Sequence, residues 1–205
     1  MLSKHGQVDR TDQHECRQVL AAFREDVLSE LDDETLALWR NAGADVSGEL
    51  VRFEPGMLRE ILKTAPPEFT QLARNRENSV RIGGRNVVFA PAYGSPFVMD
   101  LDKGRRYGTL EDFRNFIKLA QSSPWLHHSG GTICEPVDVP VNKRHLDMVY
   151  SHIRYSDRPF MGSVTTDDRA QDCIDMCRIL FGEQTVADNC VILGNVNVNS
   201  PLVWD

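Results

Sequence analysis

The sequence predicts an α/β protein in which a helical segment and a small antiparallel β segment precede the first part of a parallel β/α barrel. Two observations support this class. From residue 127 onward, strand-like segments alternate with single amphipathic helices in the order βαβαβ. Before residue 109, helical periodicity is followed by short alternating runs next to a glycine pair. We therefore expect an extension over residues 1–108 and a partial barrel over residues 109–205.

The N-terminal third is predicted to be helical. Apolar residues recur at helical spacing over residues 13–31, which predicts an amphipathic helix. Asp33 is a suitable cap for a second helix, and Gly43 is well placed to end it. A third helix is expected to start at Pro55 and to stop before Pro66.

A small antiparallel sheet is expected next. Apolar residues alternate in Val80–Ile82 and Val87–Phe89, on either side of Gly83 and Gly84, which is typical of a hairpin. Phe97–Met99 offers a further short strand. The following helix should begin with a capping box formed by Thr109 and the acidic residue three positions later.

The rest of the chain reads as three strands joined by two helices. We expect strands over His127–Cys134, Pro159–Thr165 and Cys190–Asn197, with helices over residues 142–156 and 167–181. Single helices between strands imply parallel pairing with right-handed crossovers. Cys173 and Cys177 lie four residues apart on the second helix, where we expect them to pack in the core as small apolar groups and not to bind zinc.

The third strand favours a barrel over a doubly wound sheet. One face of it is apolar, while the other changes to the amides Asn195, Asn197 and Asn199 toward its carboxyl end. A barrel has such a semi-polar inner face, open at the carboxyl ends of its strands. A dinucleotide-binding sheet would need a glycine-rich turn after the first strand, where Glu135 and Pro136 stand instead.

Composition excludes several classes of protein. The 205 residues carry a net charge of −7, which argues against a nucleic-acid partner. We expect the basic pairs Arg105–Arg106 and Lys143–Arg144 to be solvated. No apolar run is long enough for a membrane span, and the start of the chain is too polar for a signal peptide. Five cysteines, an odd number, suit a reducing compartment, so the cytoplasm is the expected location.

The candidate site residues are the polar and aromatic groups at the strand ends. A carboxylate, amides and a Trp face suit a cationic or quaternary ammonium ligand. These residues are the hypothetical substrate-binding groups Glu135, Thr165, Asn197, Asn199 and Trp204. In the alternative interpretation, the amides bond to loop backbone and Trp204 packs in the core.

The histidines are expected to be structural. His127 and His128 precede the first strand, at the end of a barrel that contributes stability, and His145 should be exposed in the first turns of a helix. No nucleophile elbow, phosphate loop or metalloprotease motif is present, so the pattern identifies neither a catalytic residue nor a metal ligand.

Taken together, several motifs resemble the trimethylamine methyltransferase family. The resemblance runs from about residue 13 to the end of the chain. Its motifs are Asn41–Ala44, Asp100–Arg106, Thr109–Phe113, Gly130–Gly131, Glu135–Pro140, Arg144–Met148, Ser156–Val164 and Asn197–Asp205.

The resemblance implies a TIM (β/α)8 barrel, of which about three β/α units would lie in this chain. It implies an enzyme that moves a methyl group from trimethylamine, or from a related quaternary amine such as a betaine, to the cobalt of a corrinoid protein. The corrinoid would be carried by that partner, with no cofactor bound directly, and the full-length enzyme would be a homo-oligomer.

Family members are much longer than 205 residues. We therefore expect this chain to represent the truncated N-terminal part of such a methyltransferase, inactive by itself. The alternative is a non-catalytic remnant that acts only in assembly with a full-length subunit or another partner.

Overall fold

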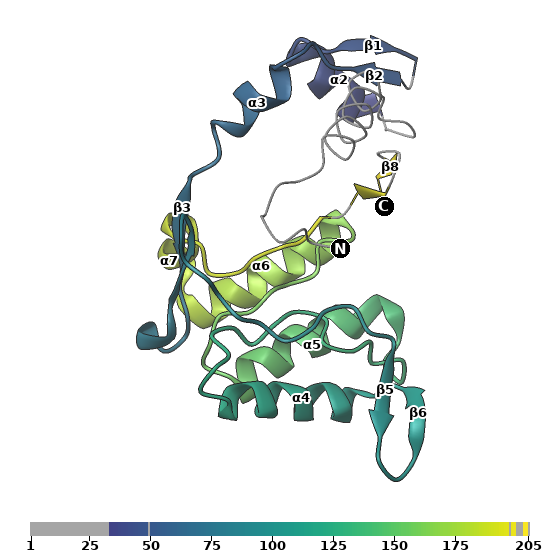
Figure 1. The fold of residues 1–205 in the computed structure, drawn as a ribbon, viewed down its shortest axis with the longest axis vertical. Helices are drawn as coiled ribbons and strands as arrows, with labels where there is room; N and C mark the ends of the chain where they lie inside the picture. The colour runs from purple at the N-terminus through teal and green to yellow at the C-terminus, as the bar shows by residue number, and fades with distance from the viewer. Residues whose placement is uncertain (1–32, 49, 197, 200–202, 205) are drawn as a thin grey trace, which may run out of the picture. The chain divides into compact units, whose positions relative to one another are not determined.

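The computed structural model describes residues 33–48, 50–196, 198–199 and 203–204 (Figure 1). The helix predicted over residues 13–31 lies outside these residues. The chain divides into two compact units. The first comprises Met1–Ala65 with Asn197–Asp205, and the second comprises Pro66–Val196. The predicted domain boundary between residues 108 and 109 is a different division and stays a prediction.

In its described residues, the first unit contains two helices and two short antiparallel strand pairs. The helices are α2 (Asp33–Asn41) and α3 (Met57–Leu62), and the strands are β1 (Asp45–Ser47), β2 (Leu50–Arg52), β7 (Val198–Asn199) and β8 (Val203–Trp204). Strand β1 pairs with β2, and β7 with β8, both antiparallel. Leu36 and Val51 form the buried core, against which the rings of Trp39 and Phe53 pack edge to face. The two predicted helices are thus confirmed, although Asp33 is the first residue of α2 and not its cap, and α3 begins at Met57 and not at Pro55.

The second unit begins with two antiparallel strand pairs. Strand β3 (Glu68–Gln71) pairs with β4 (Val80–Gly83), and β5 (Phe97–Asp100) pairs with β6 (Gly104–Tyr107). A short 3-10 helix, η1 (Arg76–Asn78), connects β3 to β4.

The predicted hairpin around Gly83 and Gly84 is wrong, because β4 pairs with the strand that precedes it and not with residues 87–89. Both glycines have positive φ, 102° and 58°. A Cβ atom at Gly83 would lie 2.2 Å from the carbonyl oxygen of Pro67. The glycine is therefore explained by the close approach of β3 as well as by the turn.

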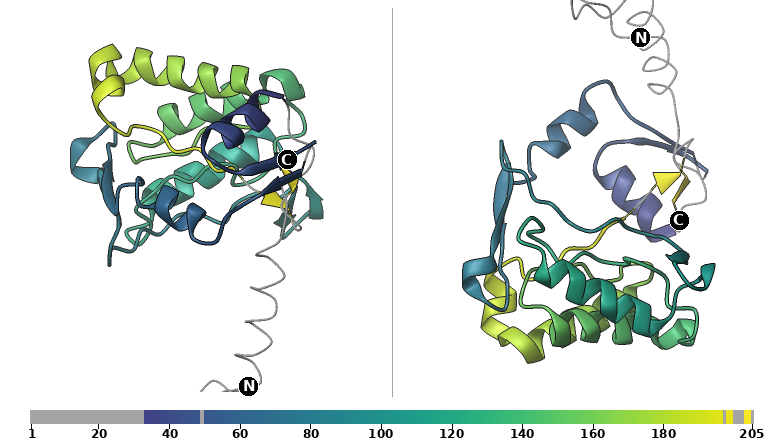
Figure 2. Two further views of the ribbon diagram at one scale, coloured as in Figure 1. Left: turned by 90° about the horizontal axis from the view of Figure 1, so that it is seen from above. Right: turned by 60° about the horizontal axis from the view of Figure 1, so that its bottom comes forward.

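Four helices follow in the second unit. They are α4 (Leu110–Ser122), α5 (Val141–Tyr155), α6 (Asp167–Phe181) and α7 (Glu183–Asp188). Helices α4, α5 and α6 lie side by side (Figures 1 and 2). The helices predicted over residues 142–156 and 167–181 are confirmed, the first of them displaced by one residue.

Helix α4 begins with the predicted capping box. The Thr109 side chain accepts a hydrogen bond from the Asp112 backbone N–H, and the Asp112 carboxylate accepts one from the Thr109 N–H. The same carboxylate binds both terminal nitrogens of Arg106, at 2.6 and 2.8 Å. Arg106 was expected to be solvated; instead it fixes β6 to the start of α4.

The three predicted parallel strands do not form continuous ladders. They are extended segments that make isolated parallel bridges. Met161 pairs with Leu193 between two of these segments, whereas Cys190 pairs with Gln71 of β3 and Cys134 pairs with Ser95. Backbone hydrogen bonds also join Ser129 to Pro159 and Met161 to Gly130, at 2.8 and 2.9 Å. The segments near residues 130, 160 and 192 are therefore neighbours. A closed barrel built on them is a proposal.

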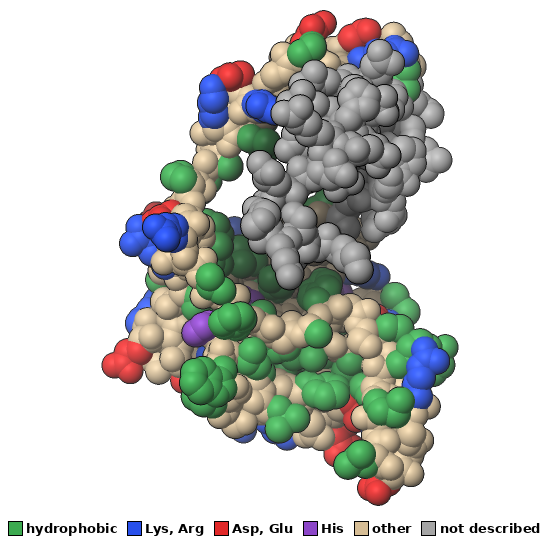
Figure 3. Space-filling model, in the orientation of Figure 1, with side chains coloured by type: hydrophobic (Ala, Val, Ile, Leu, Met, Phe, Trp, Pro, Cys, Tyr) green, Lys and Arg blue, Asp and Glu red, His purple; other side chains and the backbone are tan. Residues whose placement is uncertain are grey.

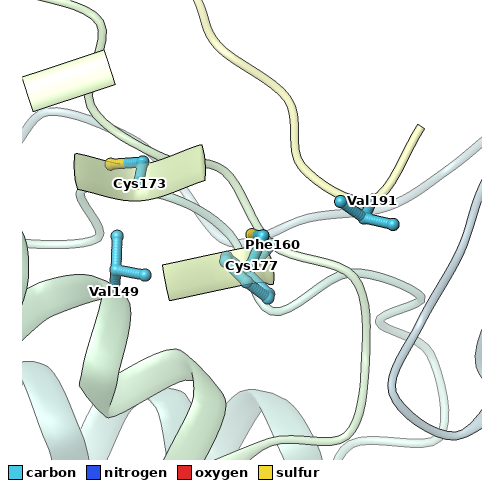
Figure 4. Packing of buried hydrophobic residues seen from close by; sticks show 5 residues of the cluster. All are labelled: Val149, Phe160, Cys173, Cys177 and Val191. Atoms are coloured by element: carbon cyan, nitrogen blue, oxygen red, sulfur yellow. The ribbon is translucent and has the colours of Figure 1, made fainter. Parts of the chain in front are cut away.

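Two apolar clusters hold the second unit together. Figure 4 shows the first, in which Val149 of α5 and Cys173 and Cys177 of α6 surround Phe160 and Val191 from the extended segments. The predicted core role of the two cysteines is confirmed, and burial raises the pKa of the Cys177 thiol to about 12. The second cluster consists of Val98, Phe113, Ile117 and Cys134.

Apolar side chains also occur on the surface of the second unit (Figure 3). The most exposed include Leu101, Trp125 and Ile179. Over the part of the chain that the structure describes, no helix combines the length and the apolar character needed to cross a bilayer.

Candidate functional site

The candidate site is a pocket of about 120 Å³ in the second unit, which we call the α5–α6 pocket. It is lined by residues from three segments: 131–135, the first three turns of α5, and 161–169 at the start of α6. The pocket thus lies where two of the extended segments end and the following helices begin. In an α/β protein, ligands bind at this position.

Two of the five predicted site residues line this pocket. Glu135 and Thr165 lie 30 positions apart in the sequence and are brought together here. Asn197 lies outside the described residues, and Asn199 and Trp204 are described only as backbone in β7 and β8 of the first unit. The complete five-residue site therefore stays a prediction.

Glu135 does not present an unpaired negative charge. Its carboxylate forms an ion pair with Arg144 of α5, whose side chain is only 14% exposed. Arg144 also donates two hydrogen bonds to the Val139 carbonyl, at 3.0 and 3.2 Å. The expectation that Arg144 is solvated is therefore wrong: it anchors the loop before α5 and neutralises the carboxylate that sequence analysis had assigned to a cation.

His145 is buried, contrary to the prediction that it is exposed. Its side chain is 6% exposed, and its Nε2 lies 2.7 Å from a carboxylate oxygen of Asp172 on α6. Because an ionised carboxylate only accepts hydrogen bonds, Nε2 must carry a hydrogen. The other ring nitrogen, Nδ1, is buried and has no hydrogen-bond partner among the described residues. His145 is one of the residues that line the α5–α6 pocket.

Arg169 also lines the pocket, but from helix α6, whereas His145 lies on α5. Located on α6, it donates a hydrogen bond of 2.9 Å from its guanidinium to the Thr165 hydroxyl. The Ser163 hydroxyl lies 3.4 Å from the same oxygen. No other hydrogen bond of the guanidinium is found within the described part of the chain. The pocket wall formed by residues 163–169 is thus rich in hydrogen-bond donors.

A buried histidine network adjoins the pocket, and one of its members, His152, is a lining residue. His152 donates from Nε2 to the Gly131 carbonyl at 3.0 Å, and its Nδ1 accepts from the Ser129 hydroxyl. The His128 Nδ1 accepts from the Gly130 N–H at 2.9 Å, which leaves its Nε2 to donate to Gln71 at 3.2 Å. Burial lowers the pKa of both histidines to about 4, so they are neutral at pH 7.

This network confirms the structural role expected for His128, whereas His152 was not predicted. His152 follows Val149 by three positions on the inward face of α5, so its helical spacing was the available signal.

Within the described ranges, no group of three or more His, Cys, Asp or Glu side chains is arranged to hold a metal ion.

The comparison with known families supports the resemblance seen in the motifs. The family Trimethylamine methyltransferase (MTTB) matches residues 14–205. The chain belongs to this family. Every residue that lines the α5–α6 pocket lies inside the matched range.

Two curated relatives are informative about this member of the trimethylamine methyltransferase family. The chain is 44% identical over 174 residues to the "Glycine betaine methyltransferase" of Desulfitobacterium hafniense (strain Y51), which covers 84% of this chain and 36% of the relative. It is 26% identical over 179 residues to the "Proline betaine:corrinoid methyltransferase" of Eubacterium limosum, covering 83% of this chain and 36% of that relative. The chain thus spans about a third of the length of these curated relatives.

Proposed function

We propose that this chain is part of a methyltransferase that takes a methyl group from a betaine and passes it to the cobalt of a corrinoid protein. The observation that carries the proposal is the 44% identity to a glycine betaine methyltransferase over 84% of the chain. Both relatives described above are named for betaines, which favours a betaine over trimethylamine as the substrate.

For this reaction, the main task of the protein is to position the amine. A quaternary ammonium nitrogen leaves as a neutral tertiary amine once one methyl group is removed, so the leaving group needs no proton from an acid. The partner's corrinoid would supply the electron pair that accepts the methyl group. The protein must hold the amine in line with that acceptor and exclude water. We propose the α5–α6 pocket as part of the binding surface for the amine.

We propose this activity for the complete protein, by which we mean the product of the full reading frame that contains these 205 residues. The chain alone spans only 36% of each relative. An alternative is that this segment serves only in assembly with a full-length subunit. The barrel architecture, with about three of its β/α units in this chain, belongs to the same proposal.

The test is a cobalt methylation assay. The complete protein is mixed with a reduced corrinoid protein and with glycine betaine, proline betaine or trimethylamine, and the visible spectrum of the cobalt is followed. We expect methylation with a betaine, at a rate at least tenfold above that with trimethylamine. Methylation by none of the three amines would refute the proposal, and a preference for trimethylamine would refute the choice of substrate.

A further inference from the structure

We infer that the α5–α6 pocket binds the carboxylate group of the substrate, and that Arg169 is the residue that recognises it. The inference deepens the proposed function and rests on it for the identity of the ligand. It assigns the carboxylate end of a betaine to this pocket, so that the ammonium end must be bound elsewhere. Four features of the described residues lead to this assignment.

The first feature is charge. Three side chains with a permanent charge at neutral pH line the pocket: Glu135, Arg144 and Arg169. Glu135 and Arg144 form an ion pair and neutralise each other. Two further N–H groups of Arg144 donate to the Val139 carbonyl, so this guanidinium is bound to groups of the protein itself. The remaining charge of the lining is the positive charge of Arg169, which suits an anionic ligand and not a cationic one.

The second feature is the supply of donors. A guanidinium carries five N–H groups in a planar fork that matches a carboxylate. One of these groups is used, in the bond to Thr165. The Thr165 oxygen accepts that bond, and it shares a hydrogen bond of 3.4 Å with the Ser163 hydroxyl, so that one of the two hydroxyls still has an O–H to donate. A carboxylate beside Arg169 would therefore meet a donating hydroxyl as well as the fork.

The third feature is the orphaned nitrogen of His145. A buried polar atom without a partner is uncommon, because burial removes its water and nothing replaces it. The Nδ1 of His145 is such an atom, and its residue lines the pocket. Asp172 holds the opposite nitrogen and thereby fixes the ring. A ligand, or a water molecule between the ligand and the ring, would give Nδ1 the partner it lacks.

The fourth feature concerns the acidic side chains nearby, which would otherwise repel an anion. Asp172 is paired with His145. Asp168 accepts hydrogen bonds from the Thr166 hydroxyl and from the Arg169 backbone N–H. Both bonds lower the pKa of the Asp168 carboxyl, and the bond from Thr166 has the larger effect. Neither carboxylate lines the pocket. Both are held outside it by partners of their own.

This assignment explains how a betaine would be distinguished from an amine without a carboxylate. Trimethylamine and the tetramethylammonium ion would leave the donors of Arg169, Thr165 and Ser163 without a ligand acceptor. A site built to bind a polar group discriminates strongly against a ligand that lacks it. Arg169 is thus proposed as a specificity-determining residue.

The experiment compares Arg169→Gln with wild type in the complete protein. In the cobalt methylation assay, we expect the KM for glycine betaine to rise by about tenfold to a hundredfold, as for a lost charge-assisted bond, while kcat changes less than about threefold. Acetate should inhibit wild type competitively and should lose this effect in the variant. Arg169→Lys should restore part of the affinity, because it keeps the charge but not the fork.

The matched control is Arg178→Gln, which removes an arginine of the same helix that pairs with Asp175 and Glu183 outside the pocket. It should keep wild-type KM. Equilibrium binding of glycine betaine, measured by calorimetry, tests the role of Arg169 separately from the proposed methyl transfer. If no methyl group is transferred but betaine binds and Arg169→Gln abolishes binding, the proposed function fails and the inference stands. If Arg169→Gln retains wild-type KM and wild-type betaine affinity, the inference is overturned.

Discussion

His128 and His152 make the stability of the protein depend on pH. Both are neutral in the folded state, where burial lowers the pKa of each to about 4 from an ordinary value of 6.5. At these two histidines the unfolded chain therefore binds more protons than the folded chain between about pH 6.5 and about pH 4. Stability is fully present above that pH and falls as the pH drops, until it levels off near pH 4.

We expect this loss to reach about 3 kcal/mol for each histidine, since one pKa unit corresponds to about 1.4 kcal/mol. Urea unfolding between pH 7.5 and 4.5 measures it. In His128→Gln, the change in the free energy of unfolding between pH 7.5 and 4.5 should be about half of that in wild type, whatever the variant's stability at pH 7.5. A free energy of unfolding that does not change between pH 7 and 5 would contradict the burial of neutral imidazoles.

Single residues were predicted least well where a partner lies far away in the sequence. His145 was expected to be exposed because it occupies the second turn of a helix, and Arg144 because it follows another basic residue. The Asp172 partner of His145 lies 27 residues later, and the Glu135 partner of Arg144 precedes it by nine. Helical periodicity describes a residue's own helix and contains no information about the charge that packs against it.

At the scale of the element, helix α4 owes its start to the capping box. The Thr109 hydroxyl satisfies one of the N–H groups that the first turn leaves without a partner. We expect Thr109→Ala to lower the free energy of unfolding by about 1 kcal/mol. Asp112→Ala should cost roughly 2 to 3 kcal/mol, because it also removes the partner of Arg106, whose guanidinium holds the pKa of that carboxyl well below its usual range.

Thermal or urea unfolding measures both changes. The matched control is Ser122→Ala at the other end of α4, where the hydroxyl bonds to the Leu119 carbonyl at an exposed position. It should alter the stability by less than about 0.5 kcal/mol. Equal effects at Ser122 and Thr109 would show that the cap contributes no more than any surface hydroxyl.

Helices were predicted more accurately than strands for a physical reason. Helix α6 begins and ends at the expected residues because its hydrogen bonds join positions four apart, and the pattern that specifies them is local. Strand pairing depends on a second segment. Gly83 and Gly84 suggested a hairpin with residues 87–89, but β3 provides the partner from upstream. The segment over Pro159–Thr165 likewise meets its parallel neighbours at a few backbone hydrogen bonds and one isolated bridge, that of Met161 with Leu193, and not along a continuous ladder.

At the scale of the whole molecule, sequence reasoning brought two of its five candidate residues to one pocket but missed the charges around them. The rule that ligands bind at the carboxyl ends of parallel strands selected Glu135 and Thr165, and both line one pocket. The expectation of a cationic ligand rested on Glu135, the amides and Trp204 together, and it considered the Glu135 carboxylate without its partner Arg144. Once that ion pair is taken into account, the remaining permanent charge of the pocket lining is that of Arg169, which is why we propose that the pocket binds the carboxylate of a betaine.

The second unit is also expected to fold without the rest of the chain. Its ends are tied together, since the Leu72 N–H donates to the Cys190 carbonyl at 2.8 Å and Gln71 pairs with Cys190 in a parallel bridge. The Gln71 side chain also donates to the Phe160 carbonyl at 2.8 Å. Both apolar clusters of the unit lie within residues 66–196. The fragment over these residues should therefore unfold cooperatively, as followed by near-ultraviolet circular dichroism.

The control is a shorter fragment over residues 73–189. It keeps all four helices but lacks Gln71, Leu72 and Cys190, and with them the bonds that close the unit. It also lacks Val191, which belongs to the first apolar cluster. We expect it to show a broad transition and little near-ultraviolet signal, because the buried Phe160 and His128 lose their partners. If the two fragments unfold alike, the segments at the two ends of the unit do not stabilise it. If the longer fragment has no cooperative transition, the second unit depends on residues outside 66–196.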